Sequence, residues 1–162
     1  MKVSGIVRKL DELGRVVIPK EIRRTLNLSE GSDIEITLVE GQLVLKKFSR
    51  MQNIRVEGEK VANSLWETVQ QPCLLTDSDK VIFVCGGKKE VVGGKLEPEF
   101  GQIRIAGEFK DLPLADGRKI DGFVAPVFCQ GFWSGSIVVL GDVGAYAGVI
   151  SFAANFLSGL LV

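Results

Sequence analysis

Residues 5–26 read GIVRKLDELGRVVIPKEIRRTL, and this stretch decides how the N-terminal part of the chain is expected to fold. The β-branched residues that gather in Val3–Lys9 and again in Arg15–Ile18 favour extended strands. Between them, residues 11–14 end in Gly14, which suits a tight turn. The pattern therefore predicts two short strands joined by a turn.

The residues that follow predict a short helix and then a hairpin. Pro19 ends the second strand and suits the first position of a helix, where its missing N–H is not needed. We expect that helix at Lys20–Leu26. Apolar residues then alternate along Asp33–Val39, and after the two-residue turn Glu40-Gly41 the strand Gln42–Phe48 completes a β-hairpin.

Positive charge is concentrated at the N-terminus, although the chain as a whole is neutral. The 162 residues carry 20 Lys and Arg and 20 Asp and Glu, but the first fifty hold ten basic residues against seven acidic ones. Such a basic segment is typical of a nucleic-acid surface, because clustered Arg and Lys attract phosphate. Solvated charges on a folded face give the same composition, so charge alone leaves both interpretations open.

A specific motif adds to this composition, because residues 5–26 resemble the DNA-binding head of the AbrB-type transition-state regulators. The likeness extends through Glu30-Gly31 and Ile34–Ile36 to Leu45–Phe48. In that family two chains exchange hairpins to form one interleaved, β-barrel-like dimer. The resemblance therefore implies an α+β head that a second chain completes. It also implies DNA contacts by Arg8, Arg15, Arg23 and Arg24, with Lys9 assisting.

Beyond the head, the sequence predicts a connector and a helix. The stretch Phe48–Glu59 is polar and is expected to be the connector. From about Asn53 to Val69 the apolar residues recur at helical spacing, which predicts a helix. Its apolar stripe consists of Ile54, Val61, Leu65 and Val69.

An α/β unit is expected after this helix. The segments Cys73–Asp77 and Val81–Cys85 are predicted to be strands. A second hairpin is predicted from Gly122–Cys129 and Ser136–Leu140, with its turn over Gln130–Gly135. The residues between the two pairs are rich in glycine and predict no defined element.

The last twenty residues, Val143–Val162, have helical periodicity and no charge. That length can cross a bilayer. However, Ser151 and Asn155 dilute the apolar run, and no cationic residue follows Lys119 to anchor a span. A helix that is apolar all round also suits a buried position between a sheet and a neighbouring subunit. We therefore expect this helix and the stripe at residues 54–69 to pack between subunits and form a tetramer, without a membrane span.

The order of a recognition head, a helix and an α/β body resembles the SpoVT-type sporulation regulators, whose body is GAF-like. Pro72–Asp77, Ala125–Phe128 and Gly135–Leu140 lie where the core strands of a GAF domain are expected. Residues 86–122 form a short stretch for a GAF domain with a roomy ligand pocket, so a small-molecule effector is left open. The expected domains are an AbrB-like DNA-binding and dimerisation head (1–50), a linker helix (51–71) and a GAF-like regulatory or oligomerisation domain (72–162).

Catalysis and metal binding are not expected. The chain has three cysteines, Cys73, Cys85 and Cys129, which form no CxxC pair, and it has no histidine. A zinc site lacks its usual ligands, and a Ser or Cys nucleophile lacks its usual base. No GxSxG, GxGxxG or P-loop motif is present. We expect no enzyme activity and no cofactor, and we expect buried, reduced thiols.

The two resemblances together imply a cytoplasmic, nucleoid-associated transcription regulator of sporulation or stationary-phase genes. It is expected to bind double-stranded DNA as a swapped dimer that assembles further into a homotetramer. One alternative is an antitoxin-like DNA-binding protein, because MazE-type antitoxins share a similar head, although they usually continue into a flexible acidic tail. A second alternative is a ligand sensor whose body alters the geometry of the head.

Overall fold

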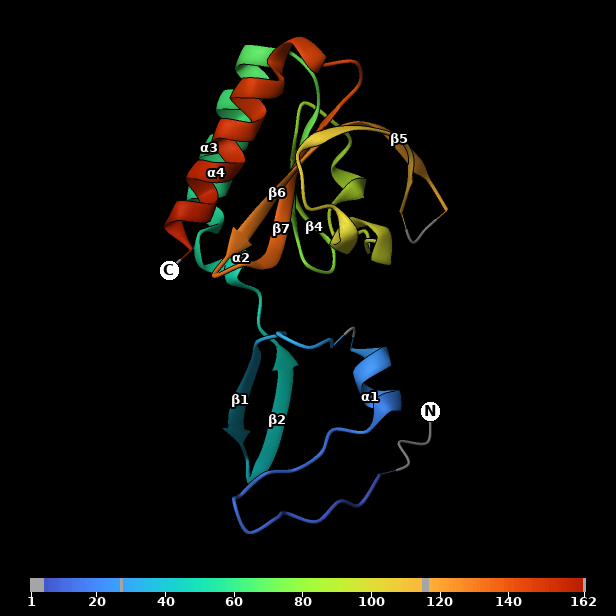
Figure 1. Ribbon diagram of the computed structural model, residues 1–162, viewed down its shortest axis with the longest axis vertical. Coiled ribbons are helices and arrows are strands. Elements are labelled where there is room, and N and C mark those ends of the chain that lie inside the picture. The colour runs from blue at the N-terminus through green and yellow to red at the C-terminus, as the bar shows by residue number, and fades with distance from the viewer. Residues whose placement is uncertain (1–4, 27, 115–116, 162) are drawn as a thin grey trace. The chain divides into compact units, whose positions relative to one another are not determined.

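The computed structural model describes residues 5–26, 28–114 and 117–161 of the chain. It divides into two compact units, Met1–Phe48 and Ser49–Val162 (Figure 1). Helices and sheets occur together, so the fold is α+β, and the sheets of the described residues are open.

The N-terminal unit contains one short helix and one hairpin. Helix α1 spans Lys20–Thr25, strand β1 spans Ile34–Val39 and strand β2 spans Gln42–Lys47. The two strands pair antiparallel from Ile34 opposite Lys47 to Val39 opposite Gln42. Glu40 and Gly41 both have positive φ, at 48° and 78°, which is the backbone of the two-residue turns that match the twist of a hairpin. The predicted helix and hairpin are therefore confirmed.

The predicted strands at Val3–Lys9 and Arg15–Ile18 are wrong for the single chain. The described residues of both segments, 5–9 and 15–18, form no strand, while Val3 and Ser4 lie outside the described residues. A strand needs a neighbour to pair its backbone N–H and C=O groups. Only the intervening turn is paired here, where the N–H of Asp11 donates to the carbonyl of Arg15 at 3.0 Å.

The N-terminal unit leaves much of its apolar surface uncovered. Val7 is 89% exposed and Leu38 is 76% exposed, and α1 has no buried residue. Isolated hairpins are marginal because they cannot bury enough apolar area. One copy of this unit therefore lacks a hydrophobic core of its own.

The second unit is built on a five-stranded antiparallel sheet with the order β4-β3-β7-β6-β5 (Figure 1). Two helices, α3 and α4, lie side by side against one face, and the short helix α2 precedes them. The other face is covered by loops that contain the 3₁₀ helices η1 and η2. A third 3₁₀ helix, η3, leads into α4. The bounds are α2 (Arg50–Asn53), α3 (Arg55–Val69), β3 (Cys73–Asp77), β4 (Val81–Cys85), η1 (Lys89–Val91), η2 (Pro98–Gln102), β5 (Gly107–Pro113), β6 (Lys119–Cys129), β7 (Phe132–Leu140), η3 (Gly144–Tyr146) and α4 (Ala147–Leu160).

Alternating side chains of this sheet form two hydrophobic cores. One core lies beneath α3 and α4 and includes Leu75, Ile137 and Leu157, none of which is exposed. The other lies on the opposite face and is centred on the fully buried Phe100. Because successive strand residues point to opposite faces, Leu74 joins the second core while Leu75 joins the first. Both faces of the sheet are therefore covered within one chain.

Three expectations for this unit need correction. The predicted connector Phe48–Glu59 is largely helical, because it contains α2 and the start of α3. The apolar stripe of α3 is not an interface between subunits, since Ile54, Leu65 and Val69 are buried against the sheet of their own chain. The predicted turn Gln130–Gly135 is too long, because Gln130 and Gly131 alone make it and the rest belongs to β7.

The C-terminal segment is helical, as its periodicity predicts, although Val162 lies outside the described residues. None of the described helices combines the length and the apolarity needed to span a membrane. Instead, Ile150 and Leu157 of α4 point into the core beneath it.

Gly135 offers a test of how closely the sheet is packed. A Cβ at this position would collide with the backbone carbonyl of Thr76 and crowd the side chain of Met51. We expect Gly135→Ala to lower the free energy of unfolding by about 1–3 kcal/mol, as overpacked cores do. Thermal unfolding followed by circular dichroism measures this change. Gly148→Ala is the matched control, because nothing lies within 4 Å of its Cβ; since this glycine is in α4, the change is expected to be neutral or to stabilise by up to about 1 kcal/mol. Equal effects of the two variants would contradict the packing.

Candidate nucleic-acid interface

The five predicted DNA-contacting residues all lie on the surface of the N-terminal unit. Arg8 and Lys9 precede the turn at residues 11–14, Arg15 follows it, and Arg23 and Arg24 occupy the last turn of α1. All five side chains are exposed. The turn brings the two flanking segments together, whereas the two arginines of α1 lie on a separate element of the same unit.

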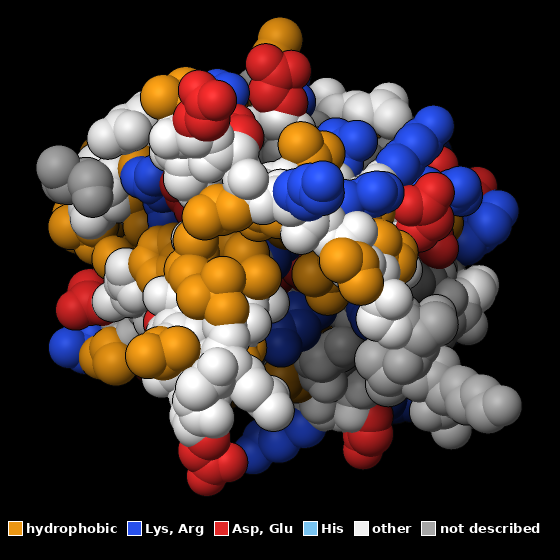
Figure 2. Space-filling view, turned by 90° about the horizontal axis from the view of Figure 1, so that it is seen from below, with side chains coloured by type: hydrophobic (Ala, Val, Ile, Leu, Met, Phe, Trp, Pro, Cys, Tyr) orange, Lys and Arg blue, Asp and Glu red, His pale blue; other side chains and the backbone are white. Residues whose placement is uncertain are grey.

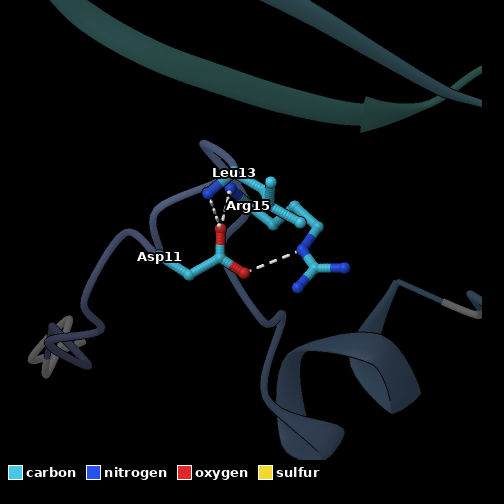
Figure 3. Close-up of polar contacts among 3 residues, drawn as sticks. All are labelled: Asp11, Leu13 and Arg15. Atoms are coloured by element: carbon cyan, nitrogen blue, oxygen red, sulfur yellow. Dashed lines mark hydrogen bonds and ion pairs between the residues drawn. The ribbon is translucent and has the colours of Figure 1, made fainter.

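Asp11 organises the turn. Its Oδ1 accepts hydrogen bonds from the backbone N–H of Leu13 at 3.0 Å and of Arg15 at 2.8 Å (Figure 3). The N–H of Gly14 donates to the carbonyl of Asp11, and Gly14 has a φ of 76°, which a residue with a side chain rarely adopts. An aspartate that accepts from the backbone two residues ahead is the mechanism by which this residue type favours turns.

The same carboxylate fixes the side chain of Arg15. Its Oδ2 accepts from Nε of Arg15 at 2.7 Å, and the guanidinium group extends away from Asp11 beyond this contact (Figure 3). The Arg15 side chain is 72% exposed. Because only Nε is engaged among the described residues, the two terminal amino groups are available to an oxygen-rich anion.

These bonds also shift the titration of Asp11. The hydrogen bond from the backbone of Arg15, followed by the bond from its side chain, lowers the pKa of Asp11 below its ordinary value of 3.8. Hydrogen bonds to the charged form of a carboxylate favour that form. The carboxylate is therefore ionised at neutral pH, and the turn is complete there.

The remaining cations of the unit differ in whether they are paired. Lys46 of β2 lies opposite Glu35 of β1, and its Nζ is 2.8 Å from the carboxylate of Glu35. No described residue forms an ion pair with Arg8, Lys9, Arg23 or Arg24. Arg24 lines a shallow surface depression with Glu21 and Thr25. Positive charge on this unit is therefore concentrated in side chains that no described carboxylate neutralises.

The N-terminal unit also exposes apolar side chains. Figure 2 shows hydrophobic surface interspersed with Lys and Arg on one face of the molecule. In the N-terminal unit, exposed apolar side chains occur both in the extended segments and on the hairpin. They include Val7, Leu10, Leu13, Val17, Ile36, Leu38 and Leu43.

Sequence reasoning missed the role of Asp11, which it treated only as an acidic residue in a turn. The signal was present in the spacing, because an aspartate three residues before a glycine can cap a tight turn through its own side chain. Its bond to Nε of Arg15 depends on the folded turn and has no comparable signal in the sequence.

Comparison with known proteins agrees with both units. The family model for "Antidote-toxin recognition MazE, bacterial antitoxin" matches residues 7–52. Stage V sporulation protein T of Bacillus subtilis (strain 168) is 34% identical over 150 residues, which cover 86% of this chain and 84% of that protein. The transition state regulatory protein AbrB of the same strain is 51% identical over 59 residues. That match covers 36% of this chain and 62% of AbrB.

The second unit has a structural relative. The crystal structure of the GAF domain from Acinetobacter phosphoenolpyruvate-protein phosphotransferase aligns with a TM-score of 0.51 and 15% sequence identity. The alignment covers 70% of this chain and 94% of that domain. The expected GAF-like fold is therefore confirmed, at the level of fold alone.

The Asp11 turn provides a test by pH. Because the pKa of Asp11 is lowered by bonds that exist only in the folded turn, the stability it contributes is present above pH 3.8 and is lost as the pH falls through the lower, folded pKa. We expect the carboxyl resonance of Asp11 to titrate below 3.8 in an NMR experiment. In Arg15→Ala the pKa is expected to rise toward 3.8 but to stay below it, because the backbone bonds remain. An identical titration in both proteins would contradict the ion pair.

Proposed function

This chain belongs to the family of stage V sporulation protein T, and from that membership we propose that it is a DNA-binding regulator of transcription. The observation that carries the proposal is the 34% identity over 84% of that relative, which spans both units. The names of the two curated relatives refer to sporulation and to the regulation of a transition state. The proposed targets are accordingly sporulation or stationary-phase genes, and binding to chromosomal DNA implies a nucleoid-associated, cytoplasmic protein.

Five cations form the proposed DNA surface. All five are exposed: Arg8, Lys9, Arg15, Arg23 and Arg24. Among them, only Arg15 forms an ion pair with a described carboxylate. Neutralising phosphates with such side chains releases counterions, which supplies most of the affinity that does not depend on sequence. Arg15 is held by Nε, so its free terminal amino groups can meet a phosphate or a guanine edge in a bidentate manner.

The proposed DNA-binding form of the head is a swapped dimer. The extended segments at residues 5–10 and 15–18 have strand-like composition but no ladder partner among the described residues. The same segments expose Val7 and Val17. Strands of a second copy would pair these backbones and cover these side chains together. Two-fold symmetry would then place both sets of cations on one surface.

We propose that α4 joins such dimers into tetramers. One face of α4 packs on the sheet, while the other exposes Val149, Phe152, Phe156 and Leu160. Phe152 is 71% exposed. An apolar row of this kind on a helix without charge is typical of an interface between subunits. This face takes the place of the α3 stripe, which its own chain buries.

An antitoxin is the second candidate, and the family model that matches residues 7–52 favours it. The continuation of the chain argues against it. Residues 49–162 form a packed unit with a GAF-like fold, whereas a toxin-wrapping tail is expected to be flexible and acidic. Ligand sensing has weaker support, because Phe100, Leu112 and Leu114 fill the sheet face that lies away from the helices.

Salt dependence tests the proposed mode of DNA binding. If the dimer makes roughly 6–10 phosphate contacts, its affinity is expected to fall about 10³–10⁵-fold between about 50 and 200 mM salt. Arg15→Ala removes one such cation per chain, so the slope of log affinity against log salt should decrease by about 2 in a symmetric dimer. Fluorescence anisotropy with a labelled duplex measures both quantities.

Lys46→Ala is the matched control for that experiment. It also removes one positive charge from the N-terminal unit, but Glu35 already neutralises this lysine across the strands. We expect its salt slope to stay close to that of the unmodified protein. Equal losses for Arg15→Ala and Lys46→Ala would point to net charge alone and would contradict the assigned surface.

The proposed tetramer has its own test. Phe152→Glu places a charge in the exposed apolar row of α4, and burying an unpaired charge is costly. We expect sedimentation velocity to show dimers for this variant and tetramers for the unmodified chain. Phe132→Glu changes an equally apolar, exposed side chain beside the β6–β7 turn and is expected to leave the tetramer intact. A variant at Phe152 that still sediments as a tetramer would exclude α4 as the interface.

A further inference from the structure

Two of the three cysteines lie directly opposite each other in the sheet of the second unit. Cys73 begins β3, Cys85 ends β4, and the two are Cα partners in the antiparallel register. Opposed residues of such a pair point to the same face of the sheet. Both side chains accordingly belong to the core beneath α3 and α4, and neither forms a disulfide.

The spacing of opposed strand residues is compatible with a disulfide. Their Cα atoms are about 4.5 or 5.5 Å apart, depending on the type of pair, and disulfides span Cα separations of about 4.4–6.8 Å. The thiol of Cys85 lies 3.6 Å from the backbone carbonyl oxygen of Cys73. Closing the pair therefore requires rotation of side chains and little movement of backbone.

The two thiols have different roles in this pair. The neighbouring thiol of Cys85 and the burial of Cys73 raise the pKa of Cys73, while the neighbouring thiol of Cys73 lowers the pKa of Cys85. The neutral Cys85 thiol donates to the carbonyl of Ala62 at 3.1 Å, so its ionisation has to break that bond. Since Cys73 can donate to a thiolate at Cys85, Cys85 is the better nucleophile and Cys73 the resolving thiol.

Access is also greater at Cys85. Its exposure is 8%, whereas Cys73 is completely buried. Strand β4 is an edge strand of the sheet, and Gly86 follows Cys85 directly. The indole of Trp66 lies against Gly86, because a Cβ there would collide with its Nε1. The indole of Trp66 therefore lies beside the end of β4 that carries Cys85.

Cys129 is separate from this pair. Its thiol donates to the carbonyl of Leu161 at 3.0 Å and accepts from Arg50. Cys73 is the register partner of Val139 in β7, and Val139 is in turn the partner of Phe123 in β6. Cys129 lies six residues farther along that strand, or about 20 Å at the rise of an extended chain. It cannot bond to Cys73 or Cys85 within one folded chain.

We propose that Cys73 and Cys85 form a redox-active dithiol site that a hydroperoxide converts into an intramolecular disulfide. The Cys85 thiolate attacks the peroxide, which yields a sulfenic acid at Cys85 and an alkoxide or hydroxide ion. The thiol of Cys73 then attacks the sulfenic sulfur, forms the S–S bond and releases water. The proton that Cys85 lost neutralises the alkoxide or hydroxide. Two thiols are oxidised by two electrons in total, and one peroxide bond is reduced.

The disulfide would fasten β4 to its neighbour at the end where Trp66 packs. Cys73 and Cys85 are close in space but are separated by the hairpin of residues 74–84. The new bond closes that hairpin covalently, and a thiol reductant reopens it by exchange. Because the indole of Trp66 lies on the residue that follows Cys85, its emission reports closure.

Peptide mapping of the oxidised full chain tests the site. The three cysteines fall in different tryptic peptides, with Cys73 in residues 61–80, Cys85 in residues 81–88 and Cys129 in residues 120–162. After treatment with hydrogen peroxide, we expect a mass loss of two hydrogen atoms. The first two peptides should be cross-linked, and dithiothreitol should restore the original mass. In a Trp133→Phe variant, which leaves Trp66 as the one tryptophan, the emission should change reversibly.

Single variants make the result specific. Cys129→Ala is the matched control and is expected to form the same cross-link to the same extent. Cys73→Ala is expected to lose it and to accumulate sulfenic acid at Cys85, which a dimedone probe traps with the protein still folded by circular dichroism. Any of three results overturns the proposal: a cross-link that involves Cys129, a disulfide between chains, or a Cys73–Cys85 pair that stays reduced while Cys129 oxidises.

Discussion

One constraint governs the N-terminal unit, because its described residues expose more apolar surface than a single chain can cover. Their hairpin is locally determined, yet Leu38 and Val7 remain exposed and the extended segments have no strand beside them. The second unit has the opposite property, because its sheet is covered on both faces and its cores are complete. In the proposed assembly a second copy covers the apolar surface of the head, while the body contributes only the outer face of α4.

Local information explains what the sequence could predict. The hairpin at residues 34–47 was predictable because alternation and a two-residue turn lie within fourteen residues of each other. Strands β3 and β4 were predictable because two short apolar runs flank a polar turn at residues 78–80. The predicted turn at residues 130–135 was longer than the observed turn at Gln130-Gly131, because a glutamine that adopts a positive φ leaves no signal in the sequence. Periodicity also identified the apolar stripe of α3. It cannot tell whether the surface that buries this stripe belongs to the same chain or to another one.

The candidate site was predictable to a lesser degree. The charge distribution and the motif identify the candidate cations. The structure adds which of these cations form ion pairs with carboxylates. Lys46 and Arg15 have the same formal charge, but Glu35 holds the ammonium group of Lys46, whereas Asp11 holds only Nε of Arg15. That distinction depends on strand register and turn geometry, neither of which a charge count contains. The same reasoning applies to Cys73 and Cys85, whose pairing follows from register and not from spacing in the sequence.

An aspartate within a basic surface would be expected to weaken the attraction for phosphate. Asp11 removes one unit of positive charge, but its three hydrogen bonds fix the turn and the side chain of Arg15. Long cationic side chains lose rotamer entropy when they bind, and an arginine that is already held loses less of it. Salt strongly screens exposed charges, so the negative charge of Asp11 only slightly weakens the attraction of the surface for distant phosphates. In the proposed complex, Arg15 is therefore positioned before DNA binds, which favours affinity through geometry where net charge alone would not.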